Sequence, residues 1–259
     1  MASSMLSLVG KTAVVTGGSK GIGRGISILL AKQGANVVVN FSSDVEKANE
    51  VVAAIRGEEK AGKVIAVQGN VGKASDVVAL FDKAEEEFGK VHIVVNSAGV
   101  LLSNYPSLAD TTEEEWDRIM GVNLKGAFLV SREAAKRIPE NAGGRIVNIT
   151  TTLVSTAFPG YAAYSASKAA VECFTKTLAK ELRGKQITAN CVAPGAVATD
   201  LFYAGKTEEQ VQMNVKASPL ERLGEPQDIA SVVLFVVSNE GVWLNAQVIR
   251  ANGGTASAS

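Results

Sequence analysis

The chain has 259 residues, and 26 basic side chains balance 26 acidic ones, so the formal net charge is zero and the basic excess of a nucleic-acid-binding protein is missing. Two cysteines, Cys173 and Cys191, and one histidine, His92, are too few for a disulfide framework or a metal site built from these residue types. No apolar run approaches the roughly 18 residues of a membrane span, and the first residues lack the layout of a signal peptide, so we expect a cytoplasmic protein that binds neither membrane nor nucleic acid.

Runs of apolar and β-branched residues alternate with stretches of helical periodicity along the chain. Thr112 and Glu115 form a capping-box pattern at the start of the longest of these stretches. The first half of the chain predicts strands at 11–16, 37–41, 64–68 and 91–95 and helices at 22–33, 45–60, 75–88 and 113–138.

The second half predicts strands at 145–150, 187–192 and 246–249 and helices at 162–183, 208–216 and 226–237. Strands that are apolar throughout and separated by helices are typical of a parallel sheet covered on both faces. The sequence therefore predicts one α/β domain over residues 1–259, a Rossmann-type, doubly wound, seven-stranded parallel sheet with helices on both faces. Residues 1–9 and 255–259 are predicted to be flexible ends.

A glycine-rich segment, Thr16-Gly17-Gly18-Ser19-Lys20-Gly21-Ile22-Gly23, joins the first predicted strand to the first predicted helix. Glycines let the backbone turn sharply and approach a pyrophosphate, and the helix N-terminus offers unpaired N–H groups to the anion. The alternative is a tight turn that binds nothing. The position between strand and helix favours dinucleotide binding, although the spacing is not that of the GxGxxG fingerprint.

The end of the second predicted strand indicates which dinucleotide fits. NAD-binding folds place a carboxylate there for the ribose 2′-hydroxyl, whereas basic or hydroxyl groups admit the 2′-phosphate of NADP. Ser42 and Ser43 follow this strand, and the first carboxylate after it is Asp44. Lys20 in the glycine-rich segment could reach the same phosphate. NADP(H) is therefore favoured, with a solvated loop lysine as the alternative interpretation of Lys20.

Tyr164 and Lys168 lie four residues apart in the helix predicted at 162–183, so their side chains share one helix face. A phenol with a pKa of about 10 is a poor acid–base catalyst at neutral pH, and a neighbouring ammonium is expected to lower that pKa. The pair alone is a frequent chance pattern. It gains weight at the carboxyl side of the sheet, where open α/β folds bind ligands, near the three hydroxyls of 150–152.

Five motifs resemble, in order and spacing, those of the short-chain dehydrogenase/reductase family, and the resemblance extends from Gly10 to about Gly254. Within that family the sequence is most similar to NADPH-dependent aldehyde and ketone reductases of the 3-oxoacyl-carrier-protein-reductase type. The resemblance implies hydride transfer from NADPH to the carbonyl of an aldehyde or ketone, or the reverse reaction on an alcohol. The motifs are TGGSKGIG at 16–23, NSAG at 96–99, VNLKG at 122–126, YSASK at 164–168 and PGAVAT at 194–199.

The resemblance also implies a role for each catalytic position. Tyr164 would protonate the carbonyl oxygen, and Lys168 would lower the pKa of Tyr164 and hold the nicotinamide ribose. Thr151 would orient the substrate oxygen, and Asn123 would support the proton relay. The residues expected to contact the cofactor are Gly17, Ser19, Lys20, Gly21, Ile22, Gly23, Ser42, Ser43, Asn70, Val71, Asn96, Ala98, Gly99, Tyr164, Lys168, Pro194, Gly195, Val197 and Thr199.

Three positions depart from the family pattern. Thr151 stands where serine is usual, which keeps the hydroxyl but adds a methyl group. Asn70 replaces the usual aspartate beside the adenine amino group, and an amide can still accept or donate a hydrogen bond. Ser97 replaces the second asparagine of the usual NNAG turn. For Thr151 we expect activity to be kept and the shape of the pocket to be altered.

Substrate choice is expected to depend on the segments 101–105, 153–161 and 201–206, whose leucines and aromatic residues favour an apolar or aromatic carbonyl compound. One alternative function is a 3-oxoacyl-thioester reductase of fatty-acid synthesis, and another is a non-catalytic NADP(H)-binding sensor or scaffold. The resemblance further implies a homo-oligomer, either a tetramer or a dimer, that pairs the helices after the fourth and fifth strands.

Overall fold

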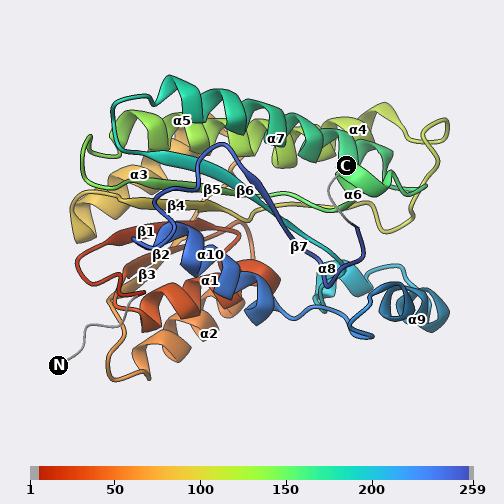
Figure 1. Ribbon diagram of the computed structural model, residues 1–259, viewed down its shortest axis with the longest axis horizontal. Coiled ribbons are helices and arrows are strands. Elements are labelled where there is room, and N and C mark those ends of the chain that lie inside the picture. The colour runs from red at the N-terminus through yellow and green to blue at the C-terminus, as the bar shows by residue number, and fades with distance from the viewer. Residues whose placement is uncertain (1–5, 257–259) are drawn as a thin grey trace.

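A seven-stranded sheet runs through the middle of the computed structural model, which describes residues 6–256 (Figure 1). All neighbouring strands are parallel, in the order β3-β2-β1-β4-β5-β6-β7. The order reverses between β1 and β4, so the predicted doubly wound Rossmann-type α/β sheet is confirmed. The strands are β1 (Thr12–Thr16), β2 (Asn36–Phe41), β3 (Val64–Gln68), β4 (Ile93–Asn96), β5 (Arg145–Ile149), β6 (Thr188–Pro194) and β7 (Val248–Ala251).

Helices cover both faces of the sheet because successive strand residues, apolar on each side, point in opposite directions. Val15 packs in a core cluster with α1 (Gly21–Lys32), α2 (Val45–Arg56) and α10 (Pro226–Val237). Its neighbour Val14 packs in a second cluster on the other face. The helices of that face are α3 (Ala74–Phe88), α5 (Ala127–Arg137) and α7 (Ala162–Glu181), as Figure 1 shows.

Several element boundaries differ from the prediction. The helix predicted at 45–60 ends at Arg56, and the last strand begins two residues later than predicted. Two four-residue helices, α6 (Leu153–Thr156) and α8 (Asp200–Tyr203), were not predicted, because a single turn has no periodicity to detect. The predicted helix at 208–216 is α9 (Glu208–Ala217).

The helix predicted at 113–138 runs without a break from Glu113 to Arg137, but its middle is π-helical. It consists of α4 (Glu113–Ile119), a π-helical segment η1 (Met120–Gly126) and α5. The predicted capping box is confirmed: the Glu115 N–H donates to Thr112 Oγ1 at 3.2 Å, and the Thr112 N–H donates to the Glu115 carboxylate at 3.1 Å. π-Helical turns occur often at functional sites, and this one contains Asn123.

The two predicted flexible ends fall partly outside the described residues, which exclude 1–5 and 257–259. Leu8 is part of the core, 3% exposed, and its N–H donates to the Gln33 carbonyl at 2.8 Å. This part of the first end is therefore held against the core, because Leu8 packs in the same cluster as Ile26 and Leu30 of α1, while Val9 is exposed. No helix between residues 6 and 256 is long and apolar enough to cross a membrane.

Candidate active site

The predicted site residues gather at one edge of the sheet because the carboxyl ends of parallel strands meet there. The segments that follow β1, β4, β5 and β6 hold the glycine-rich loop, the turn 96–99, the threonines 150–152 and the segment 194–199. Figure 1 shows α4, α6 and α8 at this end of the molecule. The segments that carry the predicted site residues thus lie at the edge of the sheet where the sequence predicts a ligand.

Lys168, Asn123 and Gly99 meet at one point of this edge. The Lys168 ammonium is buried and donates to the Ile149 carbonyl at 2.8 Å. The Asn123 side chain accepts from the Val100 N–H at 2.8 Å and donates to the Val100 carbonyl at 2.9 Å. A Cβ atom on Gly99 would lie 3.6 Å from Lys168 Nζ and 3.4 Å from Asn123 Oδ1. The absence of a side chain on Gly99 therefore leaves space directly in front of a buried cation and an amide.

Tyr164 projects from the first turn of α7, and Lys168 Nζ lies 5.9 Å from the centre of its ring. Burial raises the pKa of Tyr164 to about 12. It also lowers the pKa of Lys168 to about 8. The shift of Tyr164 is opposite in sign to the one predicted from the sequence, because burial disfavours the charged tyrosinate. The Lys168 ammonium donates its hydrogen bond to Ile149.

Thr151 lies two residues beyond the end of β5 and is 7% exposed. Its Oγ1 accepts a hydrogen bond from the Leu153 N–H at 3.2 Å, which leaves the hydroxyl hydrogen able to donate. Its neighbours are engaged elsewhere: Thr150 Oγ1 donates to the Glu172 carboxylate at 2.9 Å, and Thr152 Oγ1 donates to the Ala193 carbonyl at 3.4 Å. Of the three hydroxyls, that of Thr151 is the one with a proton available for a substrate oxygen.

The glycine-rich loop contacts two of the other predicted segments. A Cβ atom on Gly17 would lie 2.8 Å from the Ala98 Cα, and one on Gly21 would lie 3.1 Å from the Thr199 methyl group. The helix α1 that begins here has no side-chain cap and no acidic residue in its first turn, unlike α4 and α9, which have capping boxes. The N–H groups at the start of α1 are thus available to an anion, which fits the pyrophosphate of a dinucleotide.

Lys20 extends to Asp44, just beyond the end of β2, where the sequence predicts the 2′-phosphate. Its ammonium forms an ion pair with the Asp44 carboxylate at 2.5 Å, next to the exposed Ser42 and Ser43. Asp44 also accepts from the Lys47 N–H at 3.1 Å as the N-cap of α2. The pKa of Asp44 is lowered, chiefly by its hydrogen bond with Lys20. The sequence did not reveal the ion pair between Lys20 and Asp44. In this pair the Asp44 carboxylate competes with the 2′-phosphate that Lys20 is expected to bind.

Two predicted cofactor contacts have side chains engaged within the protein. Asn96 Nδ2 donates to Asn148 Oδ1 at 2.6 Å and to Ser131 Oγ at 3.1 Å, in a buried network that joins β4 to β5. Asn70 Oδ1 accepts from the Gly72 N–H at 2.9 Å. Any contact of Asn96 with a ligand therefore falls to its backbone. The asparagines at or next to the ends of the apolar strands IVVN and RIVNI were the available signal for this network.

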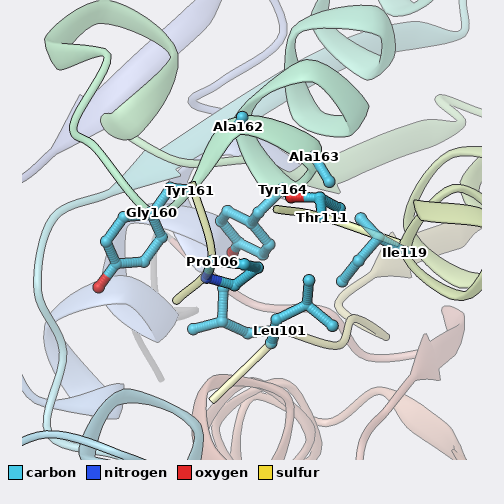
Figure 2. A pocket seen from close by; sticks show the side chains of 10 residues that line it. Leu101, Pro106, Thr111, Ile119, Gly160, Tyr161, Ala162, Ala163 and Tyr164 are labelled. Atoms are coloured by element: carbon cyan, nitrogen blue, oxygen red, sulfur yellow. The ribbon is translucent and has the colours of Figure 1, made fainter. Parts of the chain in front are cut away.

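A small apolar cavity lies against the Tyr164 ring. Its volume is about 10 Å³, roughly that accessible to one water molecule. Figure 2 shows the rings of Tyr161 and Tyr164 projecting from the start of α7, with Leu101 and Ile119 facing Tyr164. A larger groove, about 520 Å³, shares Gly160 with this cavity and is lined by aromatic and apolar residues such as Phe158. Of the residues in the segments predicted to govern substrate choice, Leu101 and Tyr161 line the cavity, and Tyr105 and Phe158 line the groove.

Comparison with known proteins gives concordant matches. A family model described as "Enoyl-(Acyl carrier protein) reductase" matches residues 17–256. A protein of Picea abies named "Short-chain type dehydrogenase/reductase" is 54% identical over 251 residues, which is 95% of this chain and 93% of the relative. The "NADPH-dependent aldehyde reductase-like protein, chloroplastic" of Arabidopsis thaliana is 48% identical over 257 residues, 96% of this chain and 95% of the relative. The structure of a short chain dehydrogenase from Burkholderia cenocepacia in complex with NADP has a TM-score of 0.89 and 34% identity, and the match covers 96% of this chain and 98% of that one.

Proposed function

The chain belongs to the short-chain dehydrogenase/reductase family, and we propose that it reduces the carbonyl of an aldehyde or ketone, reversibly, with Tyr164 as the proton donor. It is an NADP(H)-dependent oxidoreductase, as its relatives named NADPH-dependent aldehyde reductases and the NADP complex indicate. The observation that carries the proposal is the meeting of Lys168, Asn123 and Gly99 beside the ring of Tyr164.

The proposed chemistry adds a hydride to the carbonyl carbon and a proton to its oxygen. NADPH supplies the hydride when bound. Tyr164 donates its phenolic proton to the oxygen, and the Thr151 hydroxyl donates a hydrogen bond to the same oxygen. The Lys168 ammonium stabilises the tyrosinate that remains. Asn123, whose side chain is held by hydrogen bonding to Val100, supports the return of a proton to the Tyr164 oxygen.

The cofactor would be held by the same edge of the sheet. The start of α1 would offer its N–H groups to the pyrophosphate, and Lys20, Ser42 and Ser43 would hold the 2′-phosphate. The other residues proposed to contact it are Gly17, Ser19, Gly21, Ile22, Gly23, Asn70, Val71, Asn96, Ala98, Gly99, Tyr164, Lys168, Pro194, Gly195, Val197 and Thr199.

Replacement of Lys20 tests the assignment of the phosphate. In Lys20→Ala, the dissociation constant of NADPH is expected to rise about tenfold, because a charge-assisted hydrogen bond to phosphate is lost, while that of NADH changes little. Fluorescence titration with each dinucleotide measures both values. Lys32→Ala, which removes an exposed cation on the same helix, serves as the control. Equal losses for the two cofactors would overturn the role of Lys20.

The pKa of Lys168 predicts how reduction depends on pH. As the pH rises through about 8, Lys168 loses the charge that stabilises the tyrosinate, so kcat/KM for reduction should fall. Tyr164 stays protonated over this range because its pKa is about 12. In Lys168→Arg the falling limb should move to higher pH, since a guanidinium keeps its charge. A profile that is flat or rising through pH 8 in the wild type would contradict this role of Lys168.

Substrate class and alternatives are tested with a panel of aldehydes, cyclic diketones and acetoacetyl thioesters, with NADPH oxidation followed by absorbance. The apolar and aromatic lining of the cavity and the groove supports an apolar or aromatic carbonyl compound. Fastest turnover of the thioester would favour the alternative, a reductase of fatty-acid synthesis. NADPH binding without turnover of any compound would favour the non-catalytic sensor.

We also propose that the protein is a single-domain, cytoplasmic homo-oligomer. The partly exposed Trp116 and the exposed Phe128 lie on α4 and α5, which supports pairing through the helices that follow β4. Sedimentation equilibrium distinguishes a dimer from a tetramer. Two relatives carry the word chloroplastic in their names, so imaging of the tagged full chain decides between that compartment and the cytoplasm.

A further inference from the structure

Lys206 lies just beyond α8 in the segment 199–206, which follows β6 at the site edge of the sheet. Its ammonium donates to Tyr105 Oη at 2.6 Å and to the Phe202 carbonyl at 2.8 Å. The Tyr105 hydroxyl in turn donates to the Ala204 carbonyl at 2.6 Å. One phenol group therefore joins two residues of this segment to the loop after β4.

Aromatic rings surround the same ammonium. Lys206 Nζ lies 4.5 Å from the ring centre of Tyr105, 4.6 Å from that of Phe202 and 5.7 Å from that of Tyr161. The rings of Tyr105 and Tyr161 are 5.1 Å apart. Among residues 6–256, no carboxylate lies within 4.0 Å of Lys206 Nζ, so aromatic faces and neutral oxygens stabilise this cation.

The backbone of segment 199–206 packs closely on the same loop. A Cβ atom on Gly205 would overlap the Ser103 carbonyl, far inside van der Waals contact. Tyr161, the third ring around Lys206, precedes α7 directly and lines the cavity that contains Tyr164. Lys206 thus belongs to one of the three segments expected to govern substrate choice and contacts the other two, through Tyr105 and through Tyr161, which lines the cavity beside Tyr164.

We propose that Lys206 is a positioning residue, which fastens segment 199–206 to Tyr105 and Tyr161 and so fixes the walls of the substrate pocket. This role rests on the proposed function, because it assigns Lys206 to the substrate pocket of that reaction. Its expected effect is on substrate binding, since Lys206 contributes no group to the proton transfer.

Lys206→Met tests the proposal because methionine keeps much of the apolar length of the side chain and removes the charge. The amides of 199–206 are expected to exchange hydrogen for deuterium faster while those of the sheet keep their rates. KM for the best substrate of the panel should rise about tenfold and kcat change much less. Lys206→Arg should restore most of both effects, because a guanidinium also donates to oxygens and lies over aromatic rings.

Two further variants sharpen the result. Tyr105→Phe keeps the ring but removes the hydroxyl, so it should resemble Lys206→Met, and the double variant should be no worse than either single one. Lys216→Met, an exposed position at the end of α9, should leave exchange and KM unchanged.

Unchanged exchange of 199–206 in Lys206→Met, or a fall in kcat at constant KM, would overturn the proposal. Exchange needs no turnover, so it decides whether Lys206 fastens the segment even if the wild type reduces no compound.

Discussion

Tyr164→Phe is expected to lower kcat for carbonyl reduction by about 10²–10⁴-fold, the usual contribution of a positioned general acid. Phenylalanine fills the same space beside Leu101 and Ile119, so the fold and the cavity should be kept. NADPH should still bind, with an affinity loss of at most about tenfold for one neutral hydrogen bond. Stopped-flow absorbance of NADPH oxidation and fluorescence titration of NADPH measure the two quantities on the same sample.

Tyr203→Phe is the matched control for this experiment, because Tyr203 is exposed on α8 and the proposed chemistry does not use its hydroxyl. Its kcat should equal that of the wild type. If Tyr164→Phe reduced carbonyls at the wild-type rate, another group would have to donate the proton, and the assignment of Tyr164 would be wrong.

Gly23→Ala is expected to weaken NADPH binding by about 10- to 100-fold, which corresponds to an overpacking cost of about 1–3 kcal/mol. A Cβ atom on Gly23 would overlap the Gly17 carbonyl, well inside the 3.0 Å below which real Cβ contacts essentially never occur. The glycine-rich loop must move to accommodate it, and its N–H groups then leave the position they offer to the pyrophosphate. Isothermal titration with NADPH measures the loss.

Gly57→Ala provides the control, because a Cβ atom there would make only ordinary contacts of 3.6 Å at the end of α2. Thermal unfolding of both variants without cofactor separates loop distortion from general destabilisation. Gly23→Ala with wild-type NADPH affinity and a wild-type melting temperature would show that the loop tolerates the methyl group, which contradicts the packing described above.

The sheet could be predicted from the sequence because each strand is a short apolar run followed by a recognisable helix. The register of β4 and β5 also brings Asn96 opposite Asn148, a polar pair that the sequence marks at two strand ends. The edge of the sheet at which the candidate site lies could also be predicted, because the carboxyl ends of parallel strands meet there. The roles of the individual residues there come from family resemblance and stay predictions.

Other features depend on contacts between distant segments and could not be predicted. The π-helical segment η1 could not be predicted, because its apolar residues recur with nearly the period of an α-helix. The hydrogen bond between Asn123 in this segment and Val100 likewise joins residues far apart in the sequence. The upward pKa shift of Tyr164 reflects the degree of burial, which a YxxxK pattern does not contain. The contacts of Lys206 join residues about a hundred positions apart.

Transfer of deuterium from labelled NADPH tests whether the hydride passes directly to the carbonyl carbon of the substrate. The wild-type protein is incubated with NADPH deuterated at the transferable position of the nicotinamide and with the best carbonyl compound of the panel, and the alcohol is analysed by mass spectrometry. We expect one deuterium on the carbinol carbon, and loss of the labelled product in Tyr164→Phe. An alcohol without deuterium, or no alcohol while NADPH remains bound, would contradict this expectation.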